Sequence, residues 1–108
     1  MNTSKTLLHG TLEALVLKTL SHGVLHGYAI ARRIEARTND ALRIEEGSLY
    51  PALYRLEARG LVTSEWGTSE LGRRAKFYTL TRTGRARLAA EVKAWSTFSA
   101  AVTEVLGG

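Results

Sequence analysis

A proline interrupts the most regular apolar pattern of the chain. Within EEGSLYPALYRLEARG, residues 45–60, leucines recur at the i, i+4, i+7 spacing of one helix face: Leu49, Leu53 and Leu56. Pro51 stands between them. A proline in a helix interior costs about 3 kcal/mol, whereas the first turn tolerates it because its N–H groups have no partner within the helix. The sequence therefore predicts a helix over about residues 47–59 with Pro51 in its first turn and Gly60 at its end.

The face opposite these leucines carries no charge at its centre. Pro51 and Tyr54 point away from the leucines, and Tyr50 and Arg55 lie at the flanks. Such a face is either solvent surface that happens to lack charges or a surface that lies against another molecule. Tyr50 has the alternative of closing the core, and Ser48 is either the cap of the helix or a residue just inside it.

The rest of the chain predicts three more helices and a β-hairpin. Apolar spacing indicates helices over residues 11–21 and 27–37, and a last helix over residues 81–106 that would be about 39 Å long. Residues 61–80 are rich in β-branched and aromatic types and partly alternate in period two, which predicts a hairpin with a long tip. The expected fold class is mainly α with a small β-hairpin (α+β).

Composition narrows the classes of function that the chain can have. The 108 residues are 44% hydrophobic, enough for one domain with a modest core, and the net charge of +5 favours an anionic partner. The chain has no cysteine, one aspartate and no glycine-rich phosphate or dinucleotide motif, so no enzyme is expected. Gly23 breaks the helical geometry between His22 and His26, so neither a metal nor another cofactor is expected. No segment suits a membrane span or a signal peptide, which indicates a cytoplasmic protein.

Three strings of the chain resemble one family closely. They are LHGYAIARRIE at residues 25–35, EEGSLYPALYRLEARGLV at residues 45–62 and RRAKFYTLTRTGRARL at residues 73–88. They resemble the PadR family of bacterial transcriptional regulators, in its short branch with a single C-terminal helix. The resemblance implies a winged helix-turn-helix in residues 1–80 and a dimerisation helix in residues 81–108, the two forming one compact unit. It also implies a homodimeric repressor that binds a palindromic operator in double-stranded DNA and, in several members, a small-molecule effector.

Carried over by position, the resemblance makes the proline-bearing helix the recognition helix and the hairpin the wing. A proline near the start of that helix would fix its first turn towards base edges and phosphates. The residues expected to contact DNA are Tyr28, Gly47, Ser48, Tyr50, Pro51, Tyr54, Arg55, Arg73, Arg74 and Lys76. The alternative for the wing cations is an ordinary solvated surface.

The last helix carries an apolar stripe that one chain cannot easily cover. Burying about five such side chains from each of two copies gains about 20 kcal/mol, more than the cost of association of about 4–15 kcal/mol. The residues expected at the dimer interface are Leu8, Leu12, Leu88, Val92, Trp95, Phe98, Val102 and Leu106. The alternative is that the first and last helices pair within one chain.

Trp95 lies near the middle of the last predicted helix. In a two-fold dimer whose helices cross there, two indoles would face each other and form a slot for a planar aromatic effector. The alternative is that Trp95 only anchors the interface. For the protein as a whole, the alternative function is a winged-helix module that contacts other proteins and does not bind specific DNA.

Overall fold

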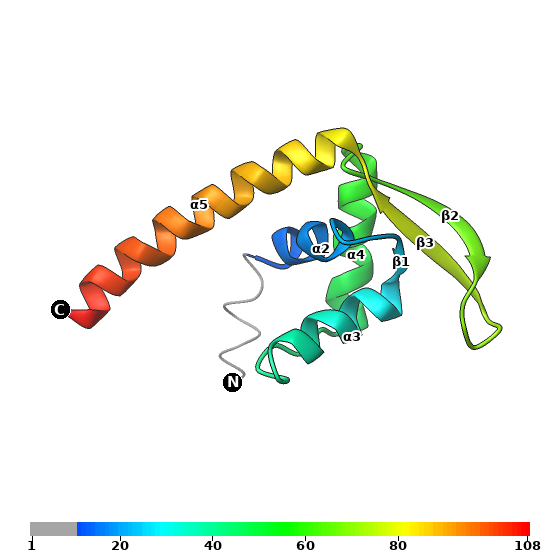
Figure 1. The fold of residues 1–108 in the computed structure, drawn as a ribbon, viewed down its shortest axis with the longest axis horizontal. Coiled ribbons are helices and arrows are strands. Elements are labelled where there is room, and N and C mark those ends of the chain that lie inside the picture. Colours follow the sequence, from blue (N-terminus) through cyan, green and yellow to red (C-terminus); the bar gives the residue numbers. More distant parts are fainter. Residues whose placement is uncertain (1–10) are drawn as a thin grey trace.

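The computed structural model describes residues 11–108, so Leu8, one of the residues expected at the dimer interface, lies outside the described part. The helices are α2 (Leu12–Leu20), α3 (Gly27–Arg37), α4 (Glu46–Ala58) and α5 (Arg82–Gly107), and the strands are β1 (Leu25–His26), β2 (Val62–Thr68) and β3 (Arg74–Leu80). Helices α2, α3 and α4 form a body from which the β2–β3 hairpin projects on one side and α5 on the other (Figure 1). The predicted α+β fold class is confirmed.

The core lies where the three helices of the body meet the base of the hairpin. Leu53 and Leu56 are fully buried and Leu49 nearly so, which confirms the leucine face of α4. From the hairpin, Val62 and Leu80 close the same cluster. These apolar contacts hold α4 against the body by one side only.

Pro51 lies deeper in α4 than the sequence predicted. The helix begins at Glu46, which makes Pro51 its sixth residue, so the prediction that it occupies the first turn is wrong. The first turn is instead closed by the amides of Ser48 and Leu49, which donate to the carbonyl of Glu45 at 3.0 and 2.9 Å. Pro51 has no N–H to donate to the carbonyl of Gly47. Since Gly47 is exposed, water can serve that carbonyl, which limits the cost of the missing bond.

The hairpin is part of a three-stranded antiparallel sheet in the order β1-β3-β2. In β1, Leu25 pairs with Tyr78 and His26 pairs with Phe77. The sequence did not predict this strand, because two residues are too few to show an alternating pattern. His26 also begins α3, since the Ala29 amide donates to its Nδ1 at 3.3 Å. The strand thus ties the start of α3 to the hairpin.

A buried carboxylate fixes the connection between α3 and α4. Asn39 and Asp40 have positive φ angles of 50° and 62°, which ends α3 where the sequence predicted. Glu35 is buried, and its carboxylate accepts from the amide of Ile44 at 2.8 Å and from the guanidinium of Arg32 at 3.0 Å. Because Ile44 lies two residues before α4, this contact helps to set where α4 starts.

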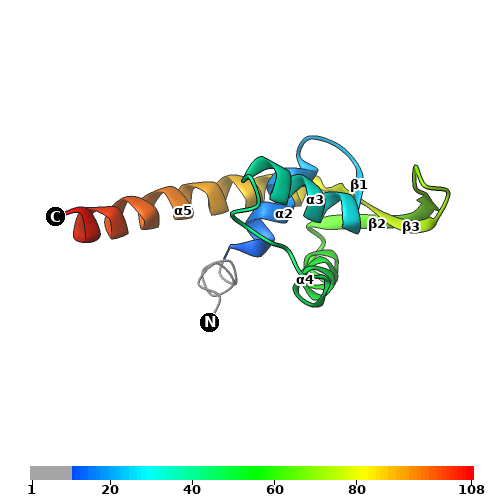
Figure 2. The same cartoon turned by 90° about the horizontal axis from the view of Figure 1, so that it is seen from below.

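The first turns of α5 are locked onto the body. Thr81 caps the helix by accepting from the Gly84 amide at 2.9 Å, and its hydroxyl donates to the carbonyl of Gly60 at 2.8 Å. A side chain at Gly84 would collide with the backbone carbonyl of Leu61, so only glycine fits there. Beyond these turns α5 extends away from the body (Figure 2).

Leu12 and Leu88 are placed differently from the other residues expected at the dimer interface. Both belong to the core of the chain itself, where α2 packs against the first part of α5. They are therefore covered without a partner. The remaining expected residues are all exposed: Val92, Trp95, Phe98, Val102 and Leu106.

Candidate nucleic-acid interface

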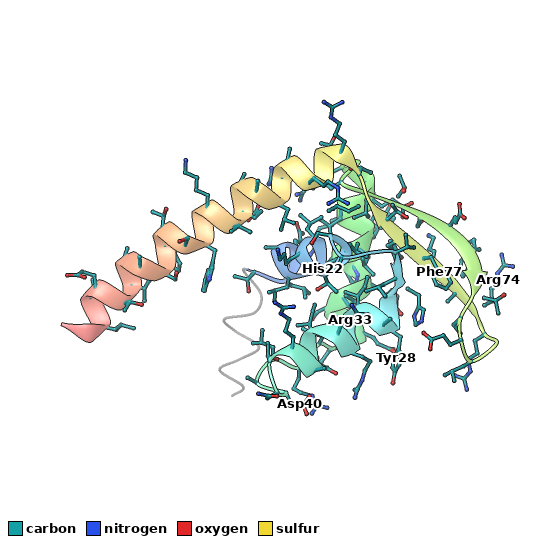
Figure 3. All side chains as sticks on the ribbon, viewed as in Figure 1. His22, Tyr28, Arg33, Asp40, Arg74 and Phe77 are labelled. Atoms are coloured by element: carbon teal, nitrogen blue, oxygen red, sulfur yellow. The ribbon has the colours of Figure 1, made fainter. Side chains whose placement is uncertain are left out.

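A groove of about 730 Å³ lies between α4 and the hairpin of residues 62–80, which we call the wing. It brings together six of the residues that the sequence predicted to contact DNA: Tyr28, Tyr50, Tyr54, Arg73, Arg74 and Lys76. They come from α3, α4 and the wing, three segments that are separate in sequence. Tyr28 lies at the start of α3 and Arg74 on the wing (Figure 3).

The strand register places the wing cations on one face. Lys76 is opposite Trp66, and Arg74 is opposite Thr68 two residues further along each strand. Successive side chains of a strand alternate between faces, so Arg74 and Lys76 share a face. Arg73 stands at the tip, where its carbonyl accepts from the Ser69 amide at 2.7 Å. The tip is therefore closed by the backbone, and Arg73 lines one end of the groove.

The side of α4 that faces away from the core is open. Tyr54 has 76% of its surface exposed, and Gly47, Ser48 and Pro51 are also exposed. Ser48 is inside the first turn of the helix and is not its cap. This face presents an aromatic ring, a hydroxyl and bare backbone, with no charge among these four residues. It can make apolar contacts and accept or donate hydrogen bonds.

Tyr50 packs against the start of α3 at the edge of the groove and is not part of the core cluster. Its ring lies over Gly27 at the start of α3, where an added Cβ would come within 2.8 Å of the ring and of the hydroxyl. Its outer surface remains exposed and lines the groove. Burial and then the nearby carboxylate of Glu46 raise the pKa of Tyr50 above its usual value of 10.0. The phenol, which is protonated at neutral pH even at its usual pKa, therefore keeps its proton to a higher pH.

Arg55 is directed elsewhere than the sequence analysis expected. Its guanidinium binds the carboxylate of Glu13 in α2 at 2.9 Å, and Arg59 binds the same carboxylate at 3.1 Å. The two arginines thus bridge α4 to α2 on the flank of the helix. A base contact from Arg55 would require this pair to break first.

Sequence reasoning missed several residues that line the groove, among them Trp66, Glu57 and Glu46. Trp66 carries both Arg74 and Lys76 over its ring. Glu57 accepts from the Ser64 hydroxyl at 2.6 Å and thereby joins the end of α4 to the base of the wing. Glu46 lies in the first turn of α4, where a carboxylate complements the helix dipole. Trp66 pairs with Lys76 across the hairpin, but that register depends on where the turn falls and is not given by the period-two pattern alone.

Across residues 11–108, His, Asp and Glu side chains nowhere gather in a group of three or more that would suit a metal ion. Over the same residues, each helix is too short or too polar to cross a membrane.

The chain has three helices followed by a β-hairpin, the outer face of the third helix is exposed, and cations lie on one face of the hairpin. This arrangement is that of a winged helix-turn-helix protein. The chain belongs to the PadR-like family of transcriptional regulators, whose family model matches residues 16–90. Proteins of this family and fold are generally not enzymes.

Relatives extend the same match over nearly the whole chain. Transcriptional regulator Rv3488 of Mycobacterium tuberculosis is 35% identical over 98 residues, covering 88% of this chain and 85% of that protein. A transcriptional regulator from Clostridium thermocellum is similar in structure with a TM-score of 0.83 and 26% identity, over 92% of this chain and 96% of that one. A PadR-like transcriptional regulator from Bacillus cereus has a TM-score of 0.79 and 28% identity, over 95% and 98% of the two chains.

Proposed function

We propose that this regulator acts by binding specific duplex DNA as a homodimer and represses transcription in the cytoplasm. The observation that supports it most directly is the groove, in which Tyr50 and Tyr54 of α4 lie with the three cations of the wing. An α-helix fits the major groove, and cations spaced along a hairpin fit the neighbouring phosphate backbone. In this proposal α4 reads base edges while Arg73, Arg74 and Lys76 fix the register on the backbone.

Dimerisation is supported by the exposed part of α5. Its apolar residues recur at helical spacing on one side and, in the described part of the chain, nothing covers them: Val92, Trp95, Phe98, Val102 and Leu106. A second copy of the same helix would bury them symmetrically. The dimer would then present two recognition helices to half-sites about 34 Å apart, which matches a palindromic operator.

The proposal is tested by titrating labelled duplex DNA with the protein and measuring mass by light scattering on the same samples. We expect a dimer, random-sequence binding that weakens as salt rises, and tighter binding to an operator recovered by sequencing the genomic fragments that the protein retains. A monomer that binds the operator with full affinity would contradict the dimeric arrangement. An absence of salt-dependent binding would favour the alternative function, a winged-helix module for protein contacts.

Trp95 and Phe98 support a secondary proposal, an effector site at the dimer interface. Their rings are 6.1 Å apart and both are more than half exposed, so they offer apolar aromatic surface near the middle of α5. A planar aromatic molecule between two such pairs would couple ligand binding to the dimer geometry. The test is fluorescence of a Trp66→Phe protein, in which Trp95 is the only indole. If planar phenolics neither quench it nor change DNA affinity, Trp95 serves as an interface anchor only.

A further inference from the structure

Trp66 stands on the groove side of the wing with two cations over one ring. The guanidinium carbon of Arg74 is 4.8 Å from the ring centre, and Nζ of Lys76 is 5.8 Å from it. Trp66 is 56% exposed, so its main contacts are not with the core. In the strand pairing, Trp66 lies directly opposite Lys76 and diagonally opposite Arg74. The indole therefore holds both wing cations in the groove.

Arg74 and Lys76 place two positive charges close to one ring. Two positive charges on one ring repel each other, and the attraction of the indole for each of them offsets that repulsion only in part. In the part of the chain that the structure describes, neither cation forms an ion pair with a carboxylate. The carboxylate of Glu57 lines the same groove but is bound by the Ser64 hydroxyl. An oxyanion near the two cations would offset their positive charge and accept hydrogen bonds from them.

We propose that Trp66 is a positioning residue that holds Arg74 and Lys76 for a phosphate of the DNA backbone lying in the groove. The inference rests on the proposed function, because it takes the anion to be part of a duplex. Long cationic side chains lose rotamer freedom when they bind an anion, and stacking on the indole removes part of that freedom beforehand. Since a phosphate carries no sequence information, Trp66 contributes to affinity for every duplex and not to the choice of operator.

The test compares variants of Trp66 on a labelled random-sequence duplex at low salt. Trp66→Ala should weaken binding about fivefold or more, because Arg74 and Lys76 then lose more rotamer freedom when they bind a phosphate. Trp66→Phe keeps an aromatic face and should recover most of the affinity, whereas Trp66→Leu keeps bulk without that face and should not. Thr63→Ala, on the opposite face of the same strand, is the matched control and should bind like the unmodified protein. Circular dichroism melting establishes that each variant is folded. If the alanine variant is not folded, the comparison of Trp66→Phe with Trp66→Leu decides whether the aromatic face is needed.

A double-mutant cycle separates positioning from direct contact. If Trp66 acts through the two cations, Trp66→Ala should add little in a protein that already carries Arg74→Ala and Lys76→Ala. Full additivity, or a Trp66→Leu protein that binds like the unmodified one, would overturn the inference. The proposed function would fail differently, because then the unmodified protein itself would show no salt-dependent binding to duplex DNA.

Discussion

On one side of α4, Leu49, Leu53 and Leu56 are sealed into the core, while on the other side Tyr54 projects from the helix with three quarters of its surface in solvent. Both sides belong to one 13-residue helix. The inner side anchors the helix by burying apolar area, and the outer side has no role in that anchoring. Stability and binding are therefore carried by different side chains of α4, and substitutions should separate the two properties.

Leu53→Ala should produce the largest effect, a loss of about 2–5 kcal/mol in the free energy of unfolding, because it leaves a cavity in a fully buried site. Urea unfolding measures it. Leu71→Ala is the matched control, since Leu71 at the wing tip is 78% exposed and the same truncation there should cost less than about 0.5 kcal/mol. Similar losses at the two positions would contradict the division between a sealed and an open side.

Tyr54→Ala should reverse that pattern. Because Tyr54 touches little of the core, the free energy of unfolding should change by less than about 0.5 kcal/mol. Affinity for the selected operator should fall by about 1–2 kcal/mol, the value of a hydrogen bond and apolar contact to DNA. Tyr54→Phe separates the two contributions, since it removes only the hydroxyl. A large fall in the melting temperature of the alanine variant would place Tyr54 in the core.

The wing should respond differently from α4. Arg73→Ala and Lys76→Ala should each weaken binding to all duplexes alike and flatten the slope of log affinity against log salt by about 0.9. The matched control is Lys93→Ala, an exposed cation on α5 outside the groove, which should leave the slope unchanged. An unchanged slope with an altered sequence preference in the wing variants would show that these cations read bases.

Local patterns in the sequence were sufficient for most of this architecture. The leucines of α4, the outward Tyr54, the shared face of Arg74 and Lys76 and the long α5 all follow from periodicity over a few residues. A periodic stripe shows that a face is apolar, but not what covers it. That is why Leu12 and Leu88, predicted at a dimer interface, lie in the core of their own chain.

Contacts between distant segments account for what the sequence did not reveal. Arg55 pairs with a glutamate 42 residues away, a relation that no local spacing encodes. The position of Pro51 within α4 depends on where that helix starts, and the buried Glu35 helps to set the start through the Ile44 amide. In both cases the decisive partner comes from another helix, so the residue type alone does not determine its role.

Tyr50 lies at the border between the two sides of α4, and its titration should give the smallest effect. Its folded pKa is raised above 10.0 by burial and by Glu46, so the folded chain favours the protonated phenol. That contribution to stability is complete below pH of about 10, the unfolded pKa, and is lost as pH rises through the folded pKa. Tyr50→Phe should therefore lose less stability than the unmodified protein when urea unfolding is repeated at increasing alkaline pH. Tyr78, whose pKa is raised first by burial, then by Glu57 and Tyr50, should contribute a further loss, and Tyr78→Phe tests that share. If only Tyr78→Phe changes the alkaline profile, Tyr50 belongs with Tyr54 on the open side of the helix.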